Sequence, residues 1–178
     1  MGQRIAPLFK EVVQLLCFSC KTDPTMDRST DLKLRGMTSL MHDSALGYHV
    51  AGHHVESIEL RHFLQELSTS RAGEVGKYIL LLSGNDIRHR LGGSLFGSLH
   101  RGWIAARGVL FSTDDANVLS ECQRGESYLI GRMDDVIKEV PMTTALRSGL
   151  QERREHLMED LMALRAMDQR ISDVGNGI

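Results

Sequence analysis

The chain has 178 residues, which is enough for one domain with a substantial core and short for two. Apolar residues make up 42% and charged residues 25%, a globular composition that excludes a disordered chain. The formal net charge of -2 gives no overall field that would attract nucleic acid or an anionic membrane, so we expect neither partner. An odd number of cysteines, three, excludes a disulfide framework and favours a cytoplasmic protein.

Residues 1–28 are predicted to form an amphipathic helix followed by a linker, because apolar residues recur at helical spacing until a polar stretch breaks the pattern. Lys10 and Glu11 interrupt the apolar runs, so we expect neither a signal-peptide core nor a membrane span. Cys17 and Cys20 have the spacing of half a zinc site or of a redox pair, but the sequence offers neither a second cysteine pair nor a βαβ context. We interpret them as buried or interface thiols.

Two long helices joined by a short turn are predicted next, and they should form an antiparallel hairpin. Ser29 or Thr30 is a suitable N-cap for the first helix, which should run to about Val55. Ser57 is the expected N-cap of the second helix, which should end near Gly84. Apolar residues recur every three or four positions along one face of each helix. They are Leu34, Met37, Met41, Ala45, Tyr48, Gly52 and Val55 on the first, and Leu60, Phe63, Leu67, Tyr78 and Leu81 on the second.

A second pair of long helices follows a long crossover, which is polar and glycine-containing at first and then carries a shorter predicted helix over residues 95–111. Thr113 or Asp114 should cap the third long helix. Pro141 should open the fourth, at a first-turn position where its missing N–H does no harm. The apolar faces consist of Leu119, Cys122, Leu129, Met133 and Val136, and then of Leu146, Leu150, Leu157, Leu161 and Leu164.

The predicted fold is an all-α, ferritin-like four-helix bundle. Two antiparallel hairpins joined by one long crossover are the ferritin-like arrangement, whereas up-down bundles with short loops lack that crossover. We place the bundle at residues 29–172, with a short helix in the crossover, an additional helix in residues 1–28 and a frayed tail at residues 173–178.

Three motifs resemble those of a bacterial family of uncharacterised ferritin-like bundle proteins. They are a Gly-Tyr pair in the first helix, a His-Arg-Gly-Trp stretch in the crossover and a Glu-Cys-Gln-Arg-Gly-Glu stretch in the third helix, all within residues 40–164. The resemblance implies a fold but no activity. The chain departs from the family pattern at His53, where a glutamate is expected, and at Glu74, where an aromatic residue is expected. The residues that carry the resemblance are Tyr48, His100, Arg101, Trp103, Glu121, Arg124 and Glu126.

A ferritin-type metal centre needs a Glu on each of two helices and a Glu-x-x-His on each of the other two, all pointing inward. The Glu-x-x-His of this chain, from Glu59 to His62, lies at one end of the predicted bundle rather than at its middle. His53 lies away from the apolar face of the first helix. We therefore predict no metal and no cofactor. The alternative is iron or manganese held by Glu74, Glu126 and His53.

Four charged residues fall on the apolar faces of their helices, each at about mid-length: Arg71, Glu74, Glu126 and Arg153. An inward charge is costly unless it is paired, and two acids and two arginines at one level can neutralise one another. We predict a metal-free ionic cluster at the level where ferritin relatives hold metal, because a cation would compete with two permanently protonated arginines. The alternative is a slight rotation of the helices that places these charges in water.

The sequence favours a non-enzymatic bundle with a structural or interaction role. We expect a homo-oligomer, because the amphipathic N-terminal helix needs a surface to cover it. Phosphate-binding loops and nucleophile elbows are absent from the sequence. We interpret His100 and Trp103 as anchors of the crossover rather than as an acid–base site. The alternatives are a metal-binding ferritin-like oxidoreductase and, third, a redox module that uses Cys17 and Cys20.

Overall fold

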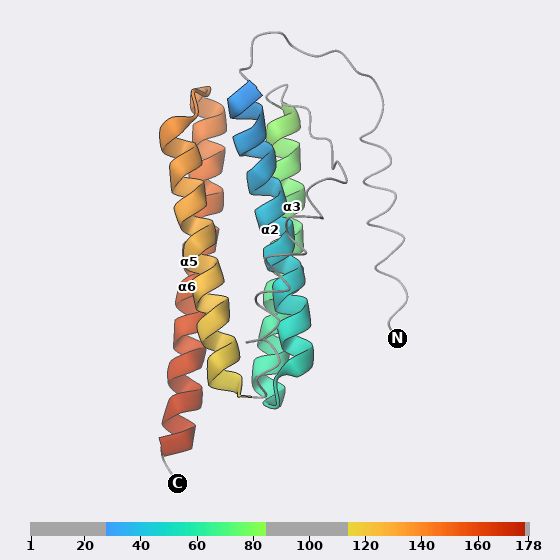
Figure 1. Cartoon of the computed structure of the whole chain (residues 1–178), viewed down its shortest axis with the longest axis vertical. Coiled ribbons are helices and arrows are strands. Elements are labelled where there is room, and N and C mark those ends of the chain that lie inside the picture. Colours follow the sequence, from blue (N-terminus) through green and yellow to red (C-terminus); the bar gives the residue numbers. More distant parts are fainter. Residues whose placement is uncertain (1–27, 85–113, 177–178) are drawn as a thin grey trace, which may run out of the picture.

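The computed structural model describes residues 28–84 and 114–176, which form four long α-helices lying side by side (Figure 1). The prediction of an all-α four-helix bundle is confirmed. The expected N-terminal helix and crossover helix lie outside the described residues. None of the described helices combines the length and the apolar composition that crossing a bilayer requires. The helices are α2 at Arg28–His54, α3 at Ile58–Gly84, α5 at Asp115–Glu139 and α6 at Thr144–Asn176.

Each helix packs against two neighbours that run in the opposite direction. Helices α2 and α6 both pack on α3 and on α5. Contacts at the two ends of the α2–α5 pair show that these helices are antiparallel. Lys33 pairs with Glu139 at one end, and the Asp115 carboxylate accepts a hydrogen bond from the Ser57 N–H at the other. Helices α3 and α5 are therefore diagonal to each other and run in the same direction. The end of α3 and the start of α5 consequently lie at opposite ends of the bundle (Figure 1).

The predicted N-caps of α3 and α5 are in place. The Ser57 hydroxyl accepts a hydrogen bond from the Leu60 N–H, at 3.2 Å. The Asp114 side chain, the second of the two expected candidates at that position, accepts from the Ala116 N–H at 3.1 Å.

The expectation that Pro141 opens the last helix is wrong. Helix α6 begins at Thr144, and the Thr143 hydroxyl accepts from the Leu146 N–H at 3.2 Å as an N-cap does. Pro141 lies in the turn instead, directly after Val140, whose N–H still bonds to α5. Because a proline has no N–H to continue that ladder, it fits a position just past the end of a helix as well as the first turn of the next.

Two further boundaries differ from the expected ones. Helix α2 already includes Ser29 and Thr30, so neither of them caps it. Helix α6 continues to Asn176, so the prediction of a frayed tail is wrong for residues 173–176. One glycine costs a helix roughly 1 kcal/mol, and extending an existing helix of this length needs no new nucleus. The Gln169 amide also donates to the Asp173 carboxylate across one turn, at 2.8 Å.

The apolar residues predicted from helical spacing form the core, with Phe63, Leu81 and Cys122 partly rather than fully buried. The core is divided into two apolar clusters along the bundle axis. The larger cluster lies towards the α5–α6 turn and contains, among others, Leu34, Met41, Tyr78, Met133 and Leu150. The smaller one lies towards the α2–α3 turn and contains, among others, Ala51, Leu60, Leu64, Leu119 and Leu164.

Candidate functional site

A layer of buried polar side chains separates the two apolar clusters at the middle of the bundle. Its buried charged members are Arg71 and Glu74 from α3, Glu126 from α5 and Arg153 from α6. Each of these positions lies in a row of residues that is mostly apolar. On α5, for example, Glu126 stands seven residues after Leu119 and seven before Met133, which are both fully buried. The same helical spacing that builds the core therefore points these charges into it.

Arg71 is the centre of the first group of contacts in this layer. Its Nη2 atom donates to Glu126 Oε1 and to Asp160 Oδ2, both at 2.6 Å, and its Nη1 atom donates to the Ser44 hydroxyl at 2.9 Å. The second Glu126 oxygen accepts a short hydrogen bond from the Tyr48 hydroxyl. The guanidinium carbon of Arg71 also lies 5.8 Å from the centre of the Tyr48 ring, within range of a cation–π contact. We call these five residues the Arg71 group.

Burial dominates the electrostatics of the Arg71 group. The side chains of Arg71 and Glu126 are both 0% exposed, whereas that of Asp160 is 18% exposed. Burial raises the pKa of the Glu126 carboxyl above its ordinary value, although Arg71 and the Tyr48 hydrogen bond act in the opposite direction. Burial likewise raises the pKa of Tyr48, and Glu126 raises it further, so this tyrosine remains a hydrogen-bond donor.

The charge of Arg71 is maintained by its partners. Burial favours the neutral form of a guanidinium, but the attraction and hydrogen bond of Glu126, together with Tyr48 and Asp160, outweigh that effect and raise the pKa of Arg71. Charge-assisted hydrogen bonds of this kind are stronger than neutral ones. The group thus consists of one permanent cation that contacts carboxylates from two different helices, α5 and α6.

Arg153 and Glu74 form the second group of contacts, which extends from the layer to the surface. Arg153 Nη1 lies 2.9 Å from Glu74 Oε2, and both side chains are less than a tenth exposed. Lys77 Nζ lies 2.7 Å from the other Glu74 oxygen, and Arg153 also contacts Glu152. Lys77 and Glu152 are both more than half exposed. We call these four residues the Arg153 group.

The structure thus places each of the four predicted charges beside an opposite charge, but in two separate groups. Within residues 28–84 and 114–176, no hydrogen bond or ion pair links the Arg71 group to the Arg153 group. Sequence reasoning missed Asp160 and Ser44, and it had assigned Tyr48 to the family motif and the core without a partner. Asp160 was detectable in principle, because it stands seven residues after Arg153 and seven before the buried Met167.

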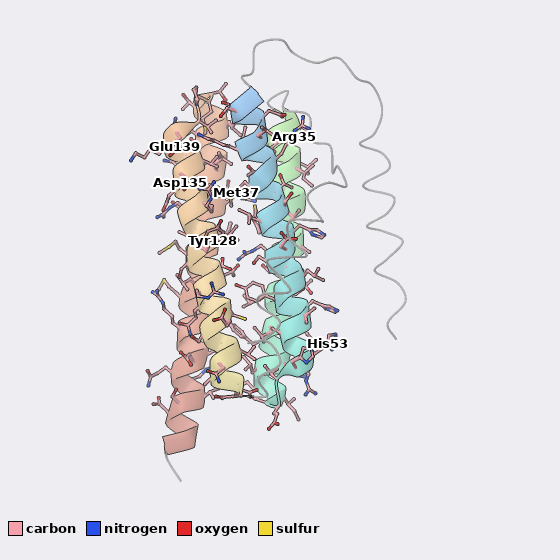
Figure 2. All side chains as sticks on the ribbon, in the orientation of Figure 1. Arg35, Met37, His53, Tyr128, Asp135 and Glu139 are labelled. Atoms are coloured by element: carbon pink, nitrogen blue, oxygen red, sulfur yellow. The ribbon has the colours of Figure 1, made fainter. Side chains whose placement is uncertain are left out.

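The residues of the metal alternative do not converge. Glu74 contacts Arg153, Glu126 contacts Arg71, and His53 is exposed near the end of α2, pointing away from the bundle (Figure 2). His62 is exposed as well, and Glu59 of the same Glu-x-x-His stretch pairs with Arg170 at 3.2 Å. Over the part of the chain that the structure describes, no three His, Cys, Asp or Glu side chains come together as metal ligands would.

The remaining predicted residues have varied positions. Glu121 and Arg124 form a surface pair one turn apart, with Arg124 Nε 2.9 Å from the carboxylate. Cys122 is half-buried, and burial, followed by Glu126 and Glu121, raises the pKa of its thiol to about 12. The other predicted residues lie outside the described ones: Cys17, Cys20, His100, Arg101 and Trp103.

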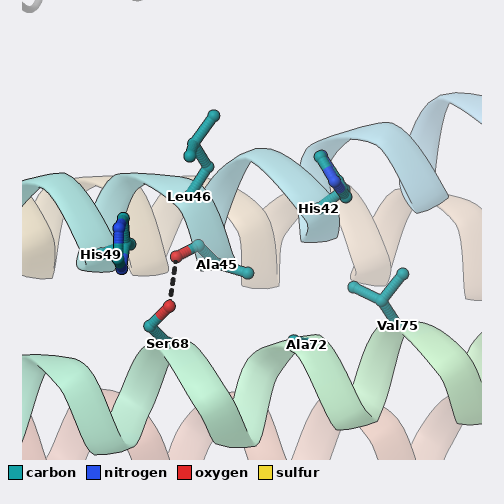
Figure 3. A pocket seen from close by; sticks show the side chains of 7 residues that line it. All are labelled: His42, Ala45, Leu46, His49, Ser68, Ala72 and Val75. Atoms are coloured by element: carbon teal, nitrogen blue, oxygen red, sulfur yellow. Dashed lines mark hydrogen bonds between the residues drawn. The ribbon is translucent and has the colours of Figure 1, made fainter. Parts of the chain in front are cut away.

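A shallow pocket of about 190 Å³ lies between α2 and α3, on the outer side of the bundle (Figure 3). Its walls are mostly apolar, from Ala45, Leu46 and Val75, and His42 and His49 stand at its two ends. The Ser68 hydroxyl, which also lines it, is used in a 2.8 Å hydrogen bond to the Ala45 carbonyl. The pocket is therefore a small gap between two helices in which no acid, base and nucleophile are brought together.

Comparison with known proteins gave one family. Residues 30–139, more than half of the chain, match the family described as Domain of unknown function (DUF2383). The chain belongs to that family. The match spans α2, α3 and α5 and therefore includes Arg71, Glu74 and Glu126, while α6 with Arg153 lies beyond it. No curated protein and no solved structure matched the chain.

Proposed function

We propose that this member of the DUF2383 family is a non-enzymatic, self-associating bundle protein of the ferritin-like class, with a structural or interaction role in the cytoplasm. Its mid-bundle layer, in this proposal, is a metal-free ionic cluster that takes the place of a metal centre. The observation that carries the proposal is the position of Arg71, whose Nη2 atom contacts carboxylates of two facing helices at the middle of the bundle.

The order and direction of the helices support the ferritin-like class. Helices α3 and α5 run in the same direction, although they follow each other in the chain. A connection between them has to cover the length of the bundle, which is about 40 Å for a helix of this size. One long crossover between two hairpins distinguishes ferritin-like bundles from up-down bundles with short loops.

The chemistry of the Arg71 group supports an ionic layer rather than a metal centre. Iron and manganese bind through carboxylate oxygens and imidazole nitrogens. Both oxygens of Glu126 are already engaged, one by Arg71 and the other by the Tyr48 hydroxyl. A metal ion would have to displace these donors and to tolerate a permanent positive charge at the same level.

Two exposed apolar side chains support an interaction role. Tyr128 on α5 is 59% exposed and Met162 on α6 is 65% exposed. Both lie between the Gln123–Asp168 contact and the Arg154–Asp134 contact of the same helix pair. Tyr and Met are enriched at protein interfaces, and they are large enough to anchor a partner surface.

One observation favours the second candidate, a ferritin-like protein or oxidoreductase that binds iron or manganese. Glu126 and Asp160 converge on a single nitrogen of Arg71, so two carboxylates from different helices lie close together at mid-bundle. Di-metal bundles use inward carboxylates at that level. In this alternative Arg71 moves aside when the ion binds.

Metal titration separates the two candidates. Protein purified without an affinity tag is analysed for bound elements and then titrated anaerobically with Fe(II) and Mn(II), in parallel with Glu126→Ala. We expect no binding of Fe(II) or Mn(II) that depends on Glu126. About one or two ions per chain that the substitution removes would establish the metal protein instead. Size-exclusion chromatography with light scattering tests the self-association, and a monomer at all concentrations would contradict it.

A further inference from the structure

The outer face of α2 carries two exposed histidines one helical turn apart, His49 and His53. Their Nε2 atoms lie 3.3 Å from each other. The two rings meet edge to face, with centroids 4.7 Å apart and planes at 87°. A spacing of four residues places side chains above one another on a helix, so the backbone itself brings these imidazoles together.

The separation of the two nitrogens is the one that a metal chelate requires. Zinc binds imidazole nitrogen at about 2.0–2.1 Å in tetrahedral geometry, which places two nitrogens of one ion about 3.3 Å apart. The structure shows that distance between the Nε2 atoms. Little rearrangement of the side chains is therefore needed to accept an ion.

The backbone that holds the two histidines is fixed by its contacts with α3. At Gly52, next to His53, a Cβ atom would lie 3.4 Å from the Arg61 carbonyl oxygen, so the two helices approach closely here. On the other side of His49, the Ser68 hydroxyl donates to the Ala45 carbonyl at 2.8 Å. The two histidines thus project from a rigid segment, and a pair of ligands held in place loses less entropy on binding than a flexible one.

We propose that His49 and His53 together chelate a late first-row divalent cation at the surface, either Zn²⁺ or Cu²⁺. Neutral imidazole suits both ions, and the order of affinities among divalent ions predicts tighter binding of Cu²⁺ than of Zn²⁺. The exposure of both side chains leaves the other coordination positions to water or to a group from a partner. The site is separate from the mid-bundle layer and shares no residue with it.

The test uses the full chain without an affinity tag, in a Cys17→Ser/Cys20→Ser background so that thiolates do not compete for the ion. Zn²⁺ binding is measured by competition with a chromogenic chelator, and Cu²⁺ binding by the nitrogen hyperfine pattern of its electron paramagnetic resonance spectrum. We expect one ion per chain and a Cu²⁺ spectrum that reports two imidazole nitrogens. His49→Ala and His53→Ala should each weaken binding by at least about tenfold.

His156→Ala is the matched control. It removes a partly exposed histidine from α6, the helix diagonal to α2, and should leave the stoichiometry and affinity unchanged. Alanine is the best helix former, so the substitutions at exposed helical positions should preserve the fold, and circular dichroism checks this. Binding that survives both His49→Ala and His53→Ala overturns the proposal. So does the absence of saturable Zn²⁺ binding below about 1 mM, in which case the two rings share only a hydrogen bond.

The outcome is independent of the mid-bundle question. Loss of Zn²⁺ with His49→Ala tests the surface chelate, whereas loss of Fe(II) or Mn(II) with Glu126→Ala tests the layer in the core. Either result can be positive or negative without changing the other.

Discussion

Substituting Arg71 with methionine removes the guanidinium of the layer and keeps an unbranched apolar side chain in its place. Glu126, whose side chain is 0% exposed, would then retain the Tyr48 hydroxyl but no cation among its described partners. Breaking a buried ion pair by removing one partner costs about 3–5 kcal/mol, because it leaves an uncompensated charge. A domain is typically stable by about 5–15 kcal/mol, so Arg71→Met should remove a large part of the total.

Urea unfolding followed by far-UV circular dichroism measures this loss. The midpoint should fall while the slope against urea stays constant, since a constant slope shows that the surface exposed on unfolding is unchanged. Arg154→Met is the matched control, because Arg154 pairs with Asp134 where both side chains are at least a third exposed. Exposed pairs contribute about 0–1 kcal/mol. The double variant Arg71→Met/Glu126→Gln should recover much of the loss, since the fully buried carboxylate is then neutral and only Asp160, whose side chain is 18% exposed, remains without its cation.

The effect should also depend on pH. Burial raises the pKa of Glu126, so the folded state binds a proton in a range where the unfolded state has released it. The contribution of Glu126 to stability therefore falls as pH rises through the window between its unfolded and folded pKa values. Arg71 opposes the shift, so Arg71→Met widens that window, and its cost should be smaller at about pH 5 than at about pH 8. A cost equal to that of Arg154→Met at about pH 8 would refute the reasoning.

Three other predictions concern single side chains. Tyr48→Phe removes the hydroxyl that donates to Glu126 and should lower the free energy of unfolding by about 1–3 kcal/mol, whereas Tyr128→Phe at an exposed position should change it little in the same urea assay. Gly131→Ala should raise that free energy by about 0.5–1 kcal/mol, because nothing lies within 4 Å of the new methyl group. Gly149→Ala should show no such gain, since its methyl group would lie 2.7 Å from the Leu81 side chain, and equal gains at both sites would contradict the packing. Burial is the main cause that raises the pKa of the Cys122 thiol to about 12. In a Cys17→Ser/Cys20→Ser background, alkylation of Cys122 by iodoacetamide at about pH 8 should therefore be roughly a thousandfold slower in the native protein than in urea. Similar alkylation rates in both states, followed by mass spectrometry, would show that the thiol is accessible.

The helices and their apolar faces could be predicted because they depend on local periodicity. Ser57 and Asp114 act at the helix starts as their side chains suggest, since an N-cap needs partners only two or three residues away. The buried positions of Arg71 and Glu126 follow from the same periodicity, because each interrupts an apolar row. Pro141 was misjudged because a proline suits both sides of a helix boundary, and the nearby Thr143 provided the cap.

The partners of the buried charges could not be predicted in the same way. Which acid meets which arginine depends on how far neighbouring helices slide along each other, and periodicity within one helix carries no information about that. The sequence therefore suggested one cluster of four charges, whereas the structure has two groups that also recruit Asp160, Lys77 and Glu152. The geometry of the His49–His53 pair could not be predicted either, because it depends on the rotation of the two side chains.

The ion pairs add to the apolar residues in determining the register of α6. On α6, Leu150, Leu157 and Leu164 repeat every seven residues, so a slide of α6 by seven residues along α3 would place leucine on leucine again. That slide would put Arg153 in the place of Asp160, beside Arg71, and two buried guanidinium groups would meet. Each unpaired buried charge costs several kcal/mol, so the shifted bundle is strongly disfavoured, the more so because Arg154 and Asp160 would then take the places of the buried Leu161 and Met167.

We therefore infer that the layer contributes to the specificity of the fold more than to its stability. Replacing a buried ion pair by apolar residues of similar volume is often neutral or stabilising, and a specified register is what such a replacement loses. Arg71→Met/Glu126→Leu/Asp160→Leu should accordingly remain helical and compact but populate more than one arrangement, visible as multiplied or broadened amide signals in its NMR spectrum. A single sharp set of signals from that variant would show that side-chain packing alone determines the register.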